Sequence, residues 1–239
     1  MSRKPVGEST RPRQGSLAVV FQVREGRLQV LLWERAREPF RGTWALPGGV
    51  LAPGETLEDS IRRHLAAKVD VREVSHLEQL ATYSDPVRDP RGWELATAYL
   101  GLVQLGLDPP VPADTRWHPV DELPPIAFDH GAIVLAGRER LRGKLSYSNA
   151  GFALAPPTFT LAELREVYVA ALGHDVSATN LRRVLERRAV IEPTGERRTP
   201  GRAGGRPAEV FRFRDAQLAI TDPFAALRPR RRGGSSTRP

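Results

Sequence analysis

The 239-residue chain contains no cysteine, so neither a disulfide framework nor a thiolate metal site is possible. It has no apolar run long enough to span a membrane, and residues 1–16 lack the hydrophobic core of a secretion signal. These absences argue against a disulfide-stabilised secreted domain and against a membrane protein. We therefore expect a cytoplasmic protein without a membrane partner, and a hydrophobic content of 40% is enough for a buried core.

The net charge of +8 is distributed unevenly along the sequence. Residues 17–157 carry slightly more acidic than basic side chains, whereas residues 1–16, 158–214 and 215–239 each have a basic excess. This asymmetry favours a polyanionic partner for the C-terminal part. The alternative is that the excess reflects mainly two solvated tails, since residues 1–16 and 215–239 carry +3 each.

The hydrophobic pattern of the first region predicts a mixture of strands and helices. Strands are expected at 17–23, 27–35, 77–85 and 94–103, and helices at 56–69 and 129–141. The Pro-rich residues 108–119 are expected to form a loop. An α/β or α+β domain follows from this order of elements.

The second region has a different pattern. A helix is expected at 161–172, where Gly173 ends it, and another at 178–188, where Ser177 can cap its first turn. Two strands then flank a long Gly- and Arg-rich loop at 194–206. Helix, turn, helix and β-hairpin in this order are typical of a winged helix.

The segment "LPGGVLAPGETLEDSIRRHLAAKVDV", residues 46–71, resembles a Nudix box. Five residues separate Gly49 from Glu55, and seven separate Glu55 from Arg63, as in the loop–helix–loop motif of that family. In the family, several glutamates follow on one helix face. Their carboxylates hold Mg²⁺ against a diphosphate, and the metal assists attack by water.

The chain departs from this pattern where the metal ligands should be. His64, Ala67 and Lys68 stand at the glutamate positions, and Asp70 stands at the position of the last glycine. We therefore predict neither catalytic nor metal-ligating residues. Lys68 is predicted to replace the metal as the counter-ion of a diphosphate, helped by His64; the alternative is that Lys68 points into solvent.

The segment at 83–103, which contains "DPRG", resembles part of the Nudix enzymes that act on ADP-ribose. The resemblance implies a pocket for ADP-ribose or a related nucleotide as effector, with no cofactor. A guanidinium is well suited to phosphate oxygens, which favours a ligand role for arginines in this region. The predicted ligand-binding residues are Arg35, Phe40, Gly48, Gly49, His64, Lys68, Asp89, Arg91 and Trp93.

Over residues 17–214 the chain resembles the Nudix-related transcriptional regulators of NAD metabolism. The resemblance rests on the order of several segments: "RLRGKLSY", "FTLAELREVY", "NLRRVLERR", "IEPTG" and "GGRPAEVFRF". It implies an α/β (α+β) Nudix fold followed by a winged helix-turn-helix domain. It also implies a homodimeric repressor that binds a palindromic operator in double-stranded DNA and is released by ADP-ribose or a relative.

The residues of the second region favour the same interpretation, because Arg and Asn are suited to the edges of guanine and adenine in the major groove. The alternative is a solvated basic helix beside a flexible loop. The predicted DNA-binding residues are Ser177, Asn180, Arg182, Arg183, Arg187, Arg202 and Arg206.

Four segments are predicted in all. They are a basic disordered tail at 1–16, a Nudix-like ligand-sensing domain at 17–145, a winged-helix domain at 146–222 and a second basic tail at 223–239. Two rival functions stay open at this level. The first is a nucleoside-diphosphate-sugar hydrolase with an atypical metal site and an accessory nucleic-acid-binding domain. The second is a nucleic-acid-binding protein whose Nudix-like domain is only a structural platform.

Overall fold

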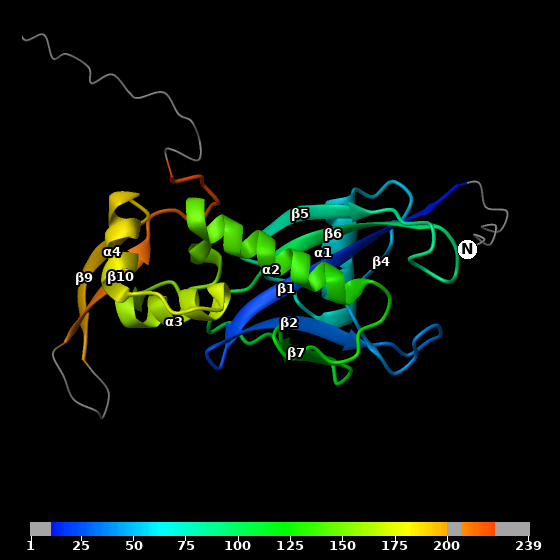
Figure 1. Ribbon diagram of the computed structural model, residues 1–239, viewed down its shortest axis with the longest axis horizontal. Coiled ribbons are helices and arrows are strands. Elements are labelled where there is room, and N and C mark those ends of the chain that lie inside the picture. Colours follow the sequence, from blue (N-terminus) through cyan, green and yellow to red (C-terminus); the bar gives the residue numbers. More distant parts are fainter. Residues whose placement is uncertain (1–10, 200–206, 223–239) are drawn as a thin grey trace, which may run out of the picture.

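A seven-stranded mixed sheet forms the centre of the N-terminal half in the computed structural model, which describes residues 11–199 and 207–222 (Figure 1). The strands are β1 (Arg13–Arg24), β2 (Arg27–Glu34), β3 (Trp44–Ala45), β4 (Gly48–Val50), β5 (His76–Tyr83), β6 (Glu94–Leu102) and β7 (Thr115–Pro119). Their order is β3-β2-β1-β6-β5, while β4 pairs with β1 and β7 pairs with β2. The central strands β1 and β6 run parallel, with Leu17 opposite Ala98. The other pairs of neighbouring strands in this sheet are antiparallel.

One helix covers each face of this sheet (Figure 1). Helix α1 (Leu57–Val69) packs Ile61 and Leu65 against Val20 on one face, and helix α2 (His130–Tyr147) packs against Phe21 on the other. Successive side chains of a strand point to opposite faces, so the apolar run of β1 supplies both cores. Helix α1 packs with the face that carries Ile61 and Leu65, because residues four apart in the sequence lie on the same side of a helix.

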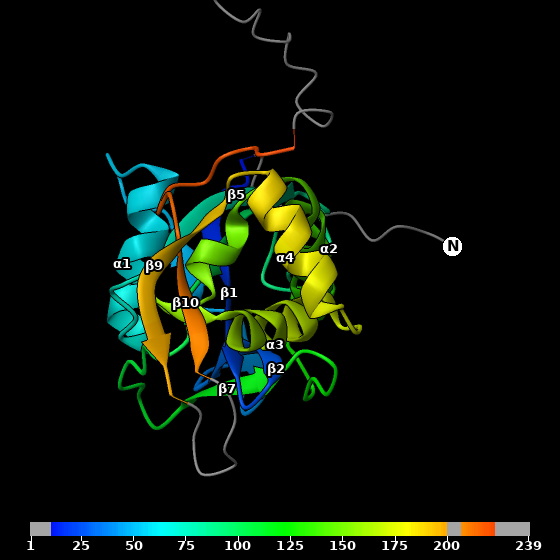
Figure 2. The same ribbon diagram turned by 90° about the vertical axis from the view of Figure 1, so that its left-hand side faces the viewer.

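A winged helix lies at the C-terminal end of the chain. Strand β8 (Phe159–Thr160) leads into helix α3 (Leu161–Leu172), then helix α4 (Ala178–Arg187), and strands β9 (Ile191–Arg198) and β10 (Ala208–Phe213) complete a sheet of order β8-β10-β9. Figure 2 views this end of the molecule, where α4 lies beside the β9–β10 hairpin. Thr160 and Glu163 form a capping box at the start of α3, and Gly173 ends the helix with φ 74°.

The winged helix and the mixed sheet share one hydrophobic core. Helix α3 contacts β1, β2 and α2, and a short 3-10 helix, η1 (Ala150–Ala153), links α2 to the winged helix. The Gln104 side-chain nitrogen donates to the Phe152 carbonyl at 3.0 Å, and the Leu105 amide donates to the Leu154 carbonyl at 2.7 Å. The two halves are therefore joined by packed side chains as well as by the chain.

Several element predictions need correction. Strand β1 begins at Arg13, inside the predicted tail at 1–16, because Arg13 pairs with Glu94 in the parallel ladder. The predicted loop at 108–119 contains β7, which pairs with β2. Helix α2 continues to Tyr147, across the predicted domain boundary at 145. Strand β9 extends into the predicted wing loop.

The predictions for residues 1–10 and 223–239 lie outside the described residues. Within the part of the chain that the structure describes, no helix is long and apolar enough to cross a membrane.

Candidate functional site

A cavity of about 490 Å³ opens beside the start of helix α2, between the loop after β2, strand β4, helix α1 and the loop before β6. Seven of the nine predicted ligand-binding residues line it: Arg35, Gly48, Gly49, His64, Lys68, Asp89 and Arg91. Phe40 and Trp93 are not in the lining. Phe40 packs edge-on against the ring of Phe128 at 4.9 Å, and the Trp93 indole nitrogen lies 3.4 Å from the Ser84 carbonyl to which it donates.

The cavity wall is rich in cations. Among the described residues, the lining contains six basic and three acidic side chains. The basic ones are Arg13, Arg35, Arg37, Lys68, Arg88 and Arg91, and the acidic ones are Glu38, Asp89 and Glu94. A low-dielectric hollow with this excess attracts anions.

The two glycines of the box let strand β4 pass close to its neighbours. A Cβ atom on Gly48 would lie 2.2 Å from the Ser16 carbonyl oxygen, and one on Gly49 would lie 2.6 Å from Cε1 of His64. At Gly48 the contact is with backbone, so only glycine fits there; at Gly49 a side chain would have to displace the buried imidazole of His64. The box loop is thereby pressed against helix α1.

The surviving acidic and basic residues of the box bind each other. Arg63 donates to both carboxylate oxygens of Glu55, at 2.6 and 2.7 Å, and Glu55 also accepts from the Ala52 amide at 3.0 Å. The Arg63 guanidinium, followed by the Ala52 amide, lowers the pKa of Glu55 from its ordinary value of 4.5 to about 2. Neither side chain lines the cavity, so this pair fixes the loop onto the helix.

His64 is buried beneath Gly49 and has its Nε2 atom 3.2 Å from the Val50 carbonyl. Burial is the main cause that lowers the pKa of His64, and the cations Arg63 and Lys68 add to it, whereas the Val50 carbonyl acts in the other direction. The neutral imidazole is therefore favoured. His64 is a packing residue of the loop here, and it adds no second cation at neutral pH.

Lys68 extends into the cavity wall. Its Nζ atom donates to the carbonyl of Gly48 at 2.5 Å and lies 4.5 Å from the centre of the Trp33 ring. Burial lowers the pKa of Lys68, and the nearby guanidiniums of Arg35, Arg63 and Arg91 lower it further. This placement does not fit the alternative in which Lys68 points into solvent.

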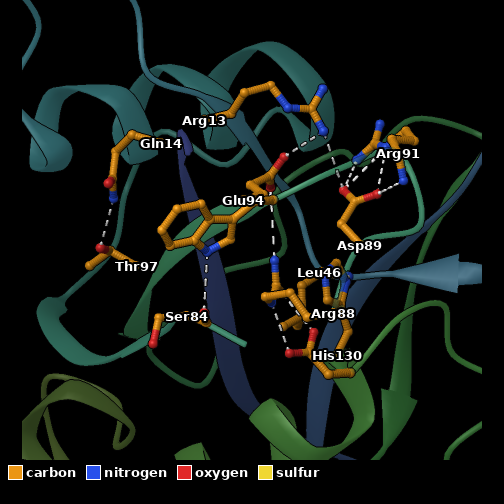
Figure 3. Close-up of polar contacts among 12 residues, drawn as sticks. Arg13, Gln14, Leu46, Ser84, Arg88, Asp89, Arg91, Glu94, Thr97 and His130 are labelled. Carbon is orange, nitrogen blue, oxygen red and sulfur yellow. Dashed lines mark hydrogen bonds and ion pairs between the residues drawn. The ribbon is translucent and has the colours of Figure 1, made fainter. Parts of the chain in front are cut away.

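A network of ion pairs that joins Arg13, Asp89, Arg91 and Glu94 forms another part of the cavity wall (Figure 3). Arg91 binds the buried Asp89 through two nitrogens, at 2.9 and 2.6 Å, and Arg13 lies 3.8 Å from the same carboxylate. Arg13 also lies 3.4 Å from Glu94, which is 3.9 Å from Arg88. The Arg91 guanidinium holds the pKa of Asp89 below its ordinary value, although burial alone would raise it.

Aromatic and imidazole rings close the side of the cavity next to α2. The Arg35 and Arg91 guanidiniums lie 4.7 and 5.4 Å from the Phe128 ring centre, which are cation–π distances. His130 is fully buried and its Nδ1 atom accepts from the Leu46 amide at 3.1 Å (Figure 3). Burial lowers the pKa of His130 to about 3, so this ring is neutral.

The sequence interpretation missed several residues of this wall: Arg13, Trp33, Arg88, Glu94, Phe128 and His130. Arg88 and Glu94 flank the "DPRG" segment, so proximity to that motif was an available signal. Arg13 lay in a segment predicted to be a tail.

The Nudix resemblance implies Mg²⁺, but the residues present do not fit a divalent cation. Hard cations need several oxygen ligands, and the box positions carry His64, Ala67 and Lys68 instead. Within residues 11–199 and 207–222, no group of three or more His, Cys, Asp or Glu side chains is arranged to hold a metal ion. In the part of the chain that the structure describes, the residues around the cavity therefore fit an anion better than a divalent cation.

Helix α4 lies in the winged helix at the C-terminal end of the fold (Figure 2), and it carries the exposed basic side chains Arg182, Arg183 and Arg187. Ser177 caps the helix by accepting from the Asn180 amide, and Arg183 donates to the Asn180 side chain at 2.9 Å, with both side chains exposed. Arg187 is also exposed in the last turn. Arg202 and Arg206 lie outside the described residues.

Arg182 is held against the hairpin. It donates to Glu186 at 2.8 Å, lies 3.5 Å from Glu209 and covers the ring of Phe211 at 5.3 Å. The two adjacent arginines therefore have different surroundings: Arg182 contacts the β9–β10 hairpin, whereas Arg183 is exposed and bonds Asn180 of its own helix.

Comparisons with known proteins match both halves of the chain. The NUDIX domain family matches residues 12–136, and the NrtR DNA-binding winged helix domain matches residues 151–213. An ADPR responsive transcriptional repressor, NtrR, from Acinetobacter baylyi is 32% identical over 201 residues, which cover 81% of this chain and 79% of that protein.

A solved structure supports the same architecture. Shewanella oneidensis NrtR complexed with a 27mer DNA is 34% identical, with a TM-score of 0.72, and the match covers 84% of this chain and 93% of that chain. An ADP-ribose pyrophosphatase from Methanocaldococcus jannaschii is 33% identical over 112 residues, 44% of this chain and 63% of that protein. The prediction of a Nudix fold followed by a winged helix is confirmed. The chain therefore belongs to the NUDIX family, in the group that joins a NUDIX domain to an NrtR-type DNA-binding winged helix.

Proposed function

We propose that this protein is a transcriptional repressor of NAD-related genes, with a NUDIX domain that senses ADP-ribose or a close relative without hydrolysing it. One observation carries the proposal: the domain with the cation-lined cavity, in whose described residues no group of His, Cys, Asp and Glu is arranged for a metal, shares a hydrophobic core with an NrtR-type winged helix. An anion can therefore bind at one end of a packed structure whose other end is suited to DNA. The relative from Acinetobacter baylyi is described as an ADPR responsive repressor, which supports the same assignment.

The DNA contacts are assigned to helix α4 and the wing. Asn180, Arg183 and Arg187 are exposed along α4, so they are the side chains proposed to reach bases or phosphates. Ser177 is proposed to contribute through the helix N-terminus, which favours phosphate oxygens. Such a protein acts where its operator is, in the cytoplasm, and a homodimer would place two recognition helices on a palindrome.

The test is a DNA-binding titration on the region upstream of the gene for this protein, measured by fluorescence anisotropy with and without ADP-ribose. A scrambled duplex of the same composition controls for non-specific binding, and AMP controls for the nucleotide. We expect tight binding to the upstream duplex that is weakened by ADP-ribose but not by AMP. Equal affinity for both duplexes would contradict the assignment as a specific regulator.

A second function is favoured by one observation, the 33% identity with an ADP-ribose pyrophosphatase. In that case the protein would be a hydrolase with an atypical metal site, and its winged helix would be an accessory nucleic-acid-binding domain. Release of AMP from ADP-ribose in the presence of Mg²⁺ distinguishes the two.

A further inference from the structure

The box position that should carry the second of two adjacent glutamates carries Lys68, and three observations show how this side chain is used. Lys68 lines the cavity, its Nζ atom donates to the Gly48 carbonyl, and the same atom lies 4.5 Å from the centre of the Trp33 ring. The side chain is half-buried and held at two points. A long flexible lysine would lie in solvent by default, so this fixed geometry indicates a defined role.

The ammonium group has no carboxylate partner to neutralise it. Among the residues that the structure describes, no Asp or Glu oxygen lies within 4.0 Å of Lys68 Nζ, and the charges that shift its pKa are all cationic. The Arg35 nitrogens likewise donate to carbonyls, those of Pro39 and Arg37, although the carboxylates of Asp89 and Glu38 also act on its charge. By contrast, Asp89 and Glu94 are already bound to arginines. A half-buried cation without a carboxylate partner is costly, and an anionic ligand would reduce that cost.

We propose that the Lys68 ammonium replaces the metal ion and binds the diphosphate of the effector directly. The inference rests on the proposed function for the identity of the nucleotide, but the anion chemistry stands on the geometry. An ammonium has three N–H donors, and the Gly48 carbonyl takes one. The two remaining N–H groups belong to a residue that lines the cavity, as Arg35 also does, and are therefore available for an anion.

This exchange explains why the rest of the box is kept. Gly48, Gly49 and the Glu55–Arg63 pair still hold strand β4 on α1, and the Gly48 carbonyl then positions Lys68. A lysine supplies one fixed positive charge but cannot present a metal-activated water. The site therefore binds a diphosphate without metal and leaves it intact.

The experiment is calorimetric titration of the full-length protein with ADP-ribose and, separately, with inorganic pyrophosphate, each in EDTA and in Mg²⁺. We expect wild type to bind both ligands in EDTA. Lys68→Met keeps the apolar stem over Trp33 but removes the charge. A charge-assisted hydrogen bond is worth a factor of about 10 to 100 in affinity, so Lys68→Met should weaken both ligands by that factor. Lys68→Glu should weaken them further in EDTA and recover partly in Mg²⁺.

Arg62→Met is the matched control. Arg62 is on the same helix, exposed, and bound to Glu58 at 2.9 Å, and it does not line the cavity. Its affinity for both ligands should be that of wild type. Thermal unfolding and binding to the upstream duplex check that Lys68→Met is folded, because Lys68 lies far from the DNA-binding helix in the fold.

The inference is overturned by unchanged affinity in Lys68→Met, by wild-type binding that requires Mg²⁺, or by no binding of pyrophosphate to wild type. Its failure is distinguishable from that of the proposed function. If pyrophosphate binds through Lys68 but ADP-ribose does not change DNA binding, the role of Lys68 stands and ADP-ribose is not the effector. If ADP-ribose releases the protein from DNA but Lys68→Met binds both ligands as wild type does, the proposed function stands and the role of Lys68 is wrong.

Discussion

Arg88 donates hydrogen bonds to both carboxylate oxygens of Asp129, at 2.9 and 2.6 Å. Arg88 belongs to the cavity wall, and Asp129 is the residue that precedes helix α2. At the other end of α2, the Tyr147 carbonyl accepts from the amides of Thr221 and Asp222. Helix α2 therefore runs from the ion-pair network of the cavity to the segment that follows the winged helix.

Loss of this pair should destabilise the protein. The Arg88 side chain is 4% exposed and the Asp129 side chain is 30% exposed, so Arg88→Met leaves a partly solvated carboxylate without its partner. Removing one partner of a fully buried ion pair costs about 3–5 kcal/mol; because water reaches Asp129, we expect a smaller loss of about 1–3 kcal/mol in the free energy of unfolding. Urea denaturation measures it.

The control for Arg88 is Arg72→Met. Arg72 bonds Asp70 at 3.0 Å, but its side chain is 76% exposed. An exposed pair contributes about 0–1 kcal/mol, so this variant should remain close to wild type. Equal losses in the two variants would show that burial of the Arg88–Asp129 pair has no special effect.

The buried His130 predicts an acid-sensitive stability. Burial lowers its pKa to about 3 in the folded protein, against an ordinary value of 6.5, so folding disfavours the protonated ring. The folded protein therefore has its full free energy of unfolding above about pH 6.5. That free energy falls as the pH decreases toward 3, because the unfolded chain binds a proton that the buried ring does not. Between about pH 7.5 and 5 the free energy of unfolding should drop by about 2 kcal/mol from this residue.

The measurement compares urea unfolding of wild type and His130→Gln at both pH values. The difference between the two proteins isolates His130 from His64 and His118, whose pKa values burial also lowers. We expect the pH-dependent loss to be smaller in the variant. An identical pH dependence would contradict a neutral, buried His130.

Helices and strands could be predicted where the pattern of residues within one segment is sufficient to determine its structure. The apolar run of β1, the period of α1 and the caps Ser177 and Gly173 depend on neighbouring residues, and each agrees with the structure. Strand β7 could not be predicted, because its sequence, TRWHP, ends in proline and follows a Pro-rich segment. It forms only because β2 offers a free edge for pairing.

The cavity could be predicted only through the box and the segment beside it. Gly48, Gly49, His64 and Lys68 lie within one motif, so a single resemblance placed them together. Arg13 enters the wall through the parallel pairing of β1 with β6, which no local pattern contains. Trp93 follows the "DPRG" segment and precedes β6, and its indole nitrogen donates to the Ser84 carbonyl, a contact that no local pattern predicts.

A homodimer is the expected assembly. One winged helix offers few base contacts, and a two-fold dimer doubles them on a palindrome with half-sites about one helical turn apart. Multi-angle light scattering at micromolar protein should give twice the mass of 26.4 kDa, both alone and on the operator duplex. A monomer under both conditions would contradict it.

Substitution of two different arginines should distinguish contacts to bases from contacts to phosphates. Arg183 is exposed on α4 and held by Asn180 at 2.9 Å, so Arg183→Ala should weaken operator binding by about 1–3 kcal/mol and relax sequence preference. Arg231→Ala, in the segment outside the described residues, removes one charge of a basic run and should weaken operator and random duplexes alike. Anisotropy titrations on both duplexes decide. Equal effects of Arg183→Ala on the two duplexes would remove its role in reading bases.

The protein should not hydrolyse ADP-ribose. The box has no carboxylate at 64, 67 or 68, and the Lys68 ammonium lies where a cation would have to bind. Purified protein with ADP-ribose and millimolar Mg²⁺ should release no AMP above a protein-free background, as measured by chromatography. A metal site needs several carboxylates on one helix face. The triple variant His64→Glu, Ala67→Glu, Lys68→Glu restores them and is therefore compared with wild type. It should bind Mg²⁺ detectably by calorimetry while wild type does not. Wild-type turnover that scales with protein concentration and stops in EDTA would overturn this prediction and favour the hydrolase.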